Sequence, residues 1–142
     1  MATSTRFAVA VHALVAMAVN EGRPLPSEQL AGSASTNPSV VRRILMSLHA
    51  AGITRAQLGV GGGALLARPA AEVTLLDVFR AVEPGGLVAT HRTPPSETCT
   101  VGRHILPALG AVTCRAERAF EAELAAATIA DVAAEVRRAA TA

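Results

Sequence analysis

The sequence contains no lysine, no tryptophan and no tyrosine, and only three phenylalanines. All 13 basic residues are therefore arginines, and the formal net charge is +2. Arginine suits the recognition of phosphate and guanine, because its planar guanidinium donates several hydrogen bonds in a fixed fork. A biased genomic base composition would replace lysine in the same way, so the positions of the arginines are more informative than their number.

Long apolar segments and a secretory signal are also missing. No apolar run approaches the ~18 residues that cross a bilayer, and the N-terminus has no basic segment followed by an apolar core. Two cysteines, Cys99 and Cys114, are too few for a disulfide scaffold. We therefore expect a cytoplasmic protein with reduced thiols and no membrane partner.

The length of 142 residues suits one small domain with an appended helix. Hydrophobic residues make up 51% of the chain, and alanine dominates its last third, where helix propensity is therefore high. A mainly helical protein is predicted.

Three helical segments near the N-terminus have the spacing of a helix-turn-helix. Apolar residues at helical intervals predict a first helix over residues 4–20. A short second helix is predicted to begin at Pro26, and the small residues 32–35 are expected to form the turn after it. A third helix follows, with Asn37 as its N-cap and Gly52 closing its C-terminus.

The third helix has the side chains expected of a DNA-reading helix. In a helix-turn-helix, the N-terminal residues of the second helix enter the major groove. We predict that six residues here contact DNA: Thr36, Asn37, Ser39, Val40, Arg42 and Arg43. A plain helical hairpin would have the same turn and caps, so this segment by itself leaves that alternative open.

A glycine-rich segment follows and is predicted to form the wing of a winged helix. Strand-like runs at residues 53–55 and 64–66 flank residues 58–63, where glycines allow the positive φ angles of a hairpin turn. A P-loop is excluded because it needs a lysine, and a dinucleotide fingerprint is excluded because no helix follows. The wing is predicted to bring four residues to DNA: Arg55, Gly59, Gly62 and Gly63.

The remaining segments complete the predicted domain plan. Thr74 and Asp77 have the spacing of a capping box at the start of a fourth helix. Residues 84–99 show no periodicity and are predicted to form a loop in which a sensor can lie. We expect a DNA-binding domain over residues 1–83, a long helix over 100–127, and a final helix over 128–140 that packs on the DNA-binding domain. Thr128 and Asp131 repeat the capping spacing at the start of this final helix, and its apolar residues Ile129, Val132 and Val136 are expected to complete the core.

The long helix is predicted to be a dimerisation helix. Its apolar residues recur at alternating steps of three and four: Ile105, Leu109, Val112, Ala116, Phe120 and Leu124. No other segment of so short a chain is long enough to cover this stripe, so the simplest partner is the same helix of a second subunit. Packing of the stripe against its own winged domain is the alternative.

These motifs resemble the Rrf-two family of bacterial winged-helix transcription regulators, relatives of IscR and NsrR. The likeness spans nearly the whole chain and rests on the third helix at 37–45, the wing at 59–68 and the helix start at 74–78. The segment Cys-Thr-Val-Gly at 99–102 looks like the YwnA-like branch of that family. The resemblance implies homodimers on palindromic promoter sites.

The resemblance also implies roles for particular residues. Ser39, Val40, Arg42 and Arg43 match positions that read the major groove in the family. Many members carry a basic residue before the first wing glycine, where this chain has Leu58, so Arg55 is the substitute candidate for the minor-groove contact.

The sensor region departs from the cluster-binding members of the family. Those members carry three closely spaced cysteines before the long helix, whereas here only Cys99 lies there and Cys114 is fifteen residues further on. With His91 and His104 the ligand set would be incomplete, so we expect no metal, no iron-sulfur cluster and no other cofactor.

Both cysteines remain candidate sensors of oxidation, with a role as small apolar fillers as the alternative. Fifteen helical residues span ~22 Å, whereas bridged Cα atoms lie within ~7 Å. A disulfide between Cys99 and Cys114 of one chain would therefore need the loop to fold back, and a bond between subunits is simpler. A small-molecule effector acting at the 84–99 loop is the other candidate signal.

The sequence thus predicts a winged helix-turn-helix domain that is mainly α with a small β-hairpin wing, joined to a long C-terminal dimerisation helix. We expect a DNA-binding transcriptional regulator, acting as a repressor. A winged-helix module for protein–protein interaction, without sequence-specific DNA binding, is the alternative. No motif supplies a metal-ligand set, a carboxylate pair or a nucleophile beside a base, so no enzyme activity is predicted.

Overall fold

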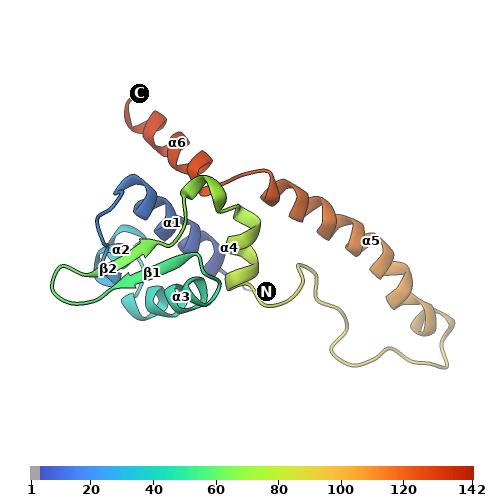
Figure 1. Cartoon of the computed structure of the whole chain (residues 1–142). Coiled ribbons are helices and arrows are strands. Elements are labelled where there is room, and N and C mark those ends of the chain that lie inside the picture. The colour runs from blue at the N-terminus through green and yellow to red at the C-terminus, as the bar shows by residue number, and fades with distance from the viewer. Residues whose placement is uncertain (1–3) are drawn as a thin grey trace. The chain divides into compact units, whose positions relative to one another are not determined.

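The computed structural model describes residues 4–142, which form helices with one β-hairpin among them (Figure 1). The helices are α1 (Arg6–Val19), α2 (Ser27–Ser33), α3 (Pro38–Ala50), α4 (Leu75–Val82), α5 (Thr100–Ala125) and α6 (Ile129–Ala140). Strands β1 (Thr54–Gln57) and β2 (Gly63–Leu66) lie between α3 and α4, with a 3-10 turn at Ala70–Glu72 after them. The predicted fold class, a mainly helical winged helix with a long C-terminal helix, is confirmed.

The chain divides into two compact units. One, called here the winged unit, runs through Pro84 and includes Leu124–Ala142; the other is Gly85–Glu123. In the winged unit, α1 contacts α3, α4 and α6. Leu14 of α1, Leu48 of α3 and Ile129 of α6 are fully buried, at 0% exposure each. Removing such a side chain leaves a cavity and costs about 2–5 kcal/mol, so this packing fixes the relative positions of these helices.

The turn of the helix-turn-helix lies later than predicted. Residues 32 and 33 were expected in the turn, but they belong to α2, which ends at Ser33. The backbone N–H of Ala34 still donates to the carbonyl oxygen of Leu30 at 3.0 Å, which extends the helical hydrogen bonding through the glycine. Ser35 then reverses the chain with a φ angle of 51°.

The hairpin pairs Thr54 with Leu66 and Gln57 with Gly63 in antiparallel register. Its first strand begins and ends later than predicted because Ile53 is a core residue, 1% exposed, and its N–H donates to the Leu48 carbonyl oxygen at 2.9 Å to close the end of α3. Leu25 adds a single bridge to β2, where its N–H and carbonyl pair with Ala64 at 3.1 and 2.9 Å. Strand β2 is therefore paired along both of its edges, with β1 on one side and Leu25 on the other.

Two capping boxes start α4 and α6, as the sequence predicted. The Thr74 Oγ1 accepts from the Asp77 N–H at 3.0 Å, and the Asp77 Oδ2 accepts from the Thr74 N–H at 3.0 Å. Thr128 and Asp131 repeat this pattern at 2.9 and 3.1 Å. Thr74 and Thr128 also form a β-bridge, which joins the N-terminus of α4 to the N-terminus of α6.

Helix α6 packs through its first turns on the rest of the winged unit, where it contacts α1 and the 3-10 turn. Ile129 and Ala133 are buried, and the Arg137 guanidinium donates to the Ala18 carbonyl oxygen at 2.9 Å. Val136 was expected in the core together with Ile129, but it is 48% exposed. It lies near the end of the helix, where the neighbouring residues are also exposed.

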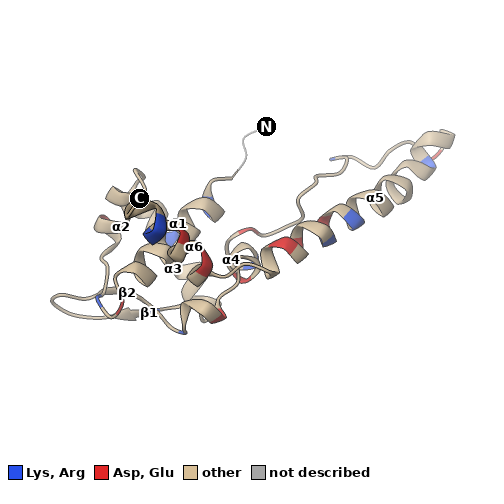
Figure 2. Cartoon of the chain, turned by 90° about the horizontal axis from the view of Figure 1, so that it is seen from above, with Lys and Arg blue, Asp and Glu red and all other residues tan. Residues whose placement is uncertain are grey.

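Helix α5 continues through Pro107, although proline cannot donate the helical hydrogen bond. The carbonyl left without a donor belongs to Arg103, an exposed residue, so water can satisfy it. Charged residues of both signs lie along α5 (Figure 2). Among the helices of residues 4–142, none is both long and apolar enough to cross a membrane.

The approach of Gly63 to Leu25 gives a test of this packing. A Cβ atom at Gly63 would lie 2.5 Å from the Leu25 carbonyl carbon, and backbone cannot move away as a side chain can. We expect Gly63→Ala to lower the free energy of unfolding by about 1–3 kcal/mol or more through overpacking, measured by urea denaturation. Gly32→Ala is the matched control, because a Cβ there meets nothing within 4 Å; equal stability of the two variants would contradict the packing described.

Candidate nucleic-acid interface

Helix α3 buries one face and presents a second, polar face to solvent. Val41, Ile44 and Leu48 are buried at 1%, 3% and 0% exposure. Since helix positions three and four apart share a face, the outward residues also recur at these steps. They are Ser39, Arg42, Arg43 and Met46, and we call them the α3 outer face.

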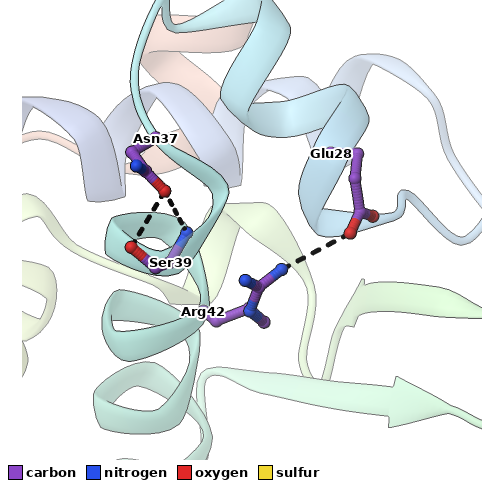
Figure 3. A network of polar contacts seen from close by, with 4 residues as sticks. All are labelled: Glu28, Asn37, Ser39 and Arg42. Atoms are coloured by element: carbon purple, nitrogen blue, oxygen red, sulfur yellow. Dashed lines mark hydrogen bonds and ion pairs between the residues drawn. The ribbon is translucent and has the colours of Figure 1, made fainter.

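Asn37 fixes the start of α3. Its Oδ1 accepts hydrogen bonds from the backbone N–H of Ser39 at 2.8 Å and from the Ser39 hydroxyl at 2.9 Å (Figure 3). This N-cap, with Pro38 in the first helical position, orients the first turn of the helix. Thr36 and Val40 are half-buried, so they present less surface than Ser39 does.

Arg42 forms an ion pair with Glu28 of α2, with 3.4 Å between its Nη1 and Oε1 (Figure 3). The two side chains are 55% and 72% exposed. An exposed pair of this kind contributes only about 0.2–1 kcal/mol, so Arg42 can exchange this carboxylate for a stronger anion at little cost. The sequence analysis missed Glu28, because the two residues are fourteen positions apart and on different helices.

A hollow of about 460 Å³ joins α3 to the hairpin. Arg42, Met46 and His49 line it from α3, and Arg55 and Gln57 line it from β1. The His49 Nδ1 lies 3.2 Å from the Thr54 carbonyl oxygen and links the two elements. The structure therefore brings Arg42 and Arg55, both predicted from sequence, to one surface.

Met46 is a further residue of this surface that the sequence analysis did not identify. It is 71% exposed although it is apolar. Its position, three and four residues after Arg43 and Arg42, was the available signal, because that spacing places it on the α3 outer face.

Arg43 lies on the opposite side of this face from the hairpin hollow. There it lines a second hollow, of about 620 Å³, together with Arg6 and Arg80. Arg6 is also within 3.5 Å of the Glu83 carboxylate. Arginines thus flank the α3 outer face on both sides, which favours a polyanion as its partner.

The wing glycines occupy two different places. Gly59 and Gly62 belong to the loop between the strands, where the Gly62 N–H donates to the Gly59 carbonyl oxygen at 3.1 Å. This loop extends away from the helices of the winged unit (Figures 1 and 2). Gly63 is the first residue of β2, directly after this loop, where it pairs with Gln57 and lies against Leu25.

The apolar stripe predicted on the long helix lies on α5. Ala116 is exposed, as are Leu109 and Val112 at 39% and 55%. Ile105, Phe120 and Leu124 are half-buried. Within the described chain, no residue of α5 is buried.

Cys99 and Cys114 are both exposed. Cys99 directly precedes α5, and backbone hydrogen bonds from Gly102 and Val101 lower the pKa of its thiol. The Arg118 guanidinium donates to the Cys114 sulfur at 3.2 Å. Because α5 is continuous from Thr100 to Ala125, the two cysteines are separated by about four helical turns, too far for a disulfide within one chain.

Comparisons with known proteins agree on one family. The model of the family Rrf2, described as iron-dependent transcriptional regulator, matches residues 3–135. YwnA of Bacillus subtilis (strain 168), assigned as an HTH-type transcriptional regulator, is 39% identical over 130 residues, which cover 91% of this chain and 95% of YwnA.

Solved structures agree with this match. A crystal structure assigned as a DNA-binding protein is 37% identical with a TM-score of 0.72, over 89% of this chain and 97% of that one. A structure assigned as a transcriptional regulator from Lactobacillus plantarum is 26% identical with a TM-score of 0.79, over 94% of this chain and 90% of that one.

The iron dependence in the family's description does not fit the donor set of this chain. In the part of the chain that the structure describes, no group of three or more His, Cys, Asp or Glu side chains could hold a metal ion. An iron-sulfur cluster normally takes four protein ligands, and Cys99 and Cys114 lie far apart.

The fold, the arginine-flanked face of α3 and the relatives thus lead to one conclusion about the class of the protein. The family match covers most of the chain, and the homologues are regulators of transcription and not enzymes. The chain belongs to the Rrf2 family of winged-helix, DNA-binding transcriptional regulators.

Proposed function

We propose that this regulator is a cytoplasmic repressor that binds a palindromic promoter site as a homodimer. The observation that carries the proposal is the α3 outer face, which presents Arg42 and Arg43 beside Arg55 of the hairpin. Each subunit reads one half-site, and the two-fold symmetry of the dimer matches the palindrome. A bound dimer excludes RNA polymerase from the promoter.

The proposal assigns different contacts to the two elements of the winged unit. Ser39, Arg42 and Arg43 enter the major groove from the first turns of α3, where arginine reads guanine through two parallel hydrogen bonds. Arg55 and the hairpin lie on the adjacent backbone and minor groove. The exposure of these arginines supports this assignment, because none is committed to the core.

Both partners of the Arg42–Glu28 ion pair can be tested for their effect on DNA binding. A duplex is first selected from a random-sequence library with the purified protein, and binding to it is measured by fluorescence anisotropy. Arg42→Ala and Arg43→Ala are each expected to weaken binding at least tenfold, since each removes about 1–3 kcal/mol of base discrimination. Glu28→Gln is expected to strengthen binding about two- to fivefold, because Arg42 no longer leaves a carboxylate to reach DNA.

Arg23→Ala is the control for loss of positive charge, since Arg23 contacts Asn20 after α1 and lies outside the proposed interface. The proposed function would be overturned if no palindromic sequence were selected from the library. It would also be overturned if Arg42→Ala and Arg43→Ala both bound DNA with the affinity of the wild-type protein. Weaker binding by Glu28→Gln would mean that the carboxylate orients Arg42 for DNA and does not compete for it.

Helix α5 is assigned to the dimer interface. Leu109, Val112 and Ala116 of its apolar stripe are exposed in one chain, and a second copy of α5 would cover them in an isologous contact. Replacing Leu109 and Val112 together with Glu would place two charges on each side of that contact.

We expect Leu109→Glu/Val112→Glu to be a monomer by light scattering, with binding to the full palindrome reduced at least tenfold. Ala111→Glu is the matched control, because residue 111 points about 100° away from Val112 around the helix. A dimer of unchanged mass in the double variant would remove α5 from the interface.

Oxidation of Cys99 is assigned as the modulating signal. A thiolate is the reactive form of cysteine, and the backbone hydrogen bonds that lower the pKa of this thiol increase the thiolate fraction at neutral pH. Diamide accepts two electrons and two protons from a pair of such thiols, one from each of two subunits, and leaves a disulfide between them.

Diamide treatment is expected to yield a disulfide-linked dimer on non-reducing gels and to change the affinity of the wild-type protein for DNA. Cys99→Ser is expected to lose both effects, whereas Cys114→Ser should keep them. Equal DNA binding by the reduced and diamide-treated wild-type protein would exclude Cys99 as a sensor.

A further inference from the structure

The tip of the hairpin presents two apolar side chains fully to solvent. Leu58 is 90% exposed and Val60 is 108% exposed, the two highest values among the exposed large hydrophobic residues of the described chain. Single apolar residues on a surface are common. Two of them together at the end of a projecting loop indicate a contact with another molecule.

The loop that carries them has a fixed shape. Gly59 and Gly61 adopt φ angles of 90° and 76°, which favour glycine. A Cβ at Gly62 would lie 2.1 Å from the Gln57 carbonyl oxygen, so the chain turns back tightly on itself there. Leu58 and Val60 therefore alternate with glycines in a turn that holds both of them at the tip.

The surroundings of the tip favour nucleic acid as the occupant. Strand β1 runs directly from the hollow that it shares with Arg42 and Met46 of α3 to Leu58, so the tip continues the DNA-binding surface. The hairpin from Thr54 to Leu66 contains one arginine, Arg55, and no acidic residue. A positively charged hairpin complements a polyanion.

We propose that Leu58 and Val60 enter the DNA minor groove as an apolar wedge beside Arg55. This inference rests on the proposed function and adds to it the means by which the wing holds DNA. Apolar side chains contact the sugar walls and open base steps in the minor groove. Such a wedge favours flexible pyrimidine–purine steps, which are unstacked most easily.

An apolar wedge and a phosphate contact differ in how the binding constant depends on salt concentration. Contacts to phosphate release counterions, so each one steepens the fall of log K with log salt concentration by about one unit. Apolar contacts release none. The affinity that Leu58 and Val60 contribute should therefore be independent of salt, whereas the contribution of Arg55 should not.

The experiment is a salt titration of binding to the selected duplex, by fluorescence anisotropy. Leu58→Ala/Val60→Ala is expected to bind about tenfold more weakly with the salt slope of the wild-type protein. Arg55→Ala should lower that slope by about two, one for each subunit of the dimer. Replacing a pyrimidine–purine step under the wing with a stiff A-tract should weaken the wild-type protein but not the double variant.

Val19→Ala/Val136→Ala is the matched control, because these valines are 42% and 48% exposed on α1 and α6. Thermal unfolding checks that each variant is folded. Wild-type affinity of the Leu58 and Val60 variant, or a loss accompanied by a lower salt slope, would overturn the wedge. Arg42→Ala distinguishes the two proposals: if it also leaves binding unchanged, the proposed function fails and not the wedge alone.

Discussion

The burial of one face of α3 is the constraint on which the rest of the structure depends. Val41, Ile44 and Leu48 are enclosed by the core. Because a helix turns by about 100° per residue, a shift of one residue would bury an arginine and expose a leucine. The cost of burying an unpaired charge excludes that arrangement. The packing of α3 thereby determines that Arg42 and Arg43 point outward.

The other contacts of the winged unit place the hairpin beside this face. Ile53 closes the end of α3 and leads into β1, while Leu25, which lies before α2, pairs with Ala64 of β2. The hairpin is thus held by the residue that follows the end of α3 and by the segment that precedes α2. This shared attachment brings Arg55 to the hollow that Arg42 lines, and the tip of the hairpin projects beyond it.

Local signals in the sequence predicted much of this arrangement. The Asn37 cap, both capping boxes and the glycine-rich hairpin depend on residues a few positions apart, and all were found in place. The sequence did not predict that α2 continues through Gly32, because glycine in a run of small residues is typical of a turn. In the structure the backbone hydrogen bonds of α2 continue past this residue. Glu28 was missed because its contact with Arg42 depends on the tertiary arrangement of α2 and α3. Val136 shows that an apolar residue at helical spacing need not be covered when its helix extends past the core.

The central claim, that the outer face of α3 reads bases in the major groove, can be tested by methylation interference on the selected duplex. Methylation of guanine N7 blocks the major-groove edge that arginine recognises, and methylation of adenine N3 blocks the minor groove. N7 methylation in each half-site is expected to abolish binding, at positions related by two-fold symmetry. Binding that tolerates N7 methylation throughout both half-sites would contradict it.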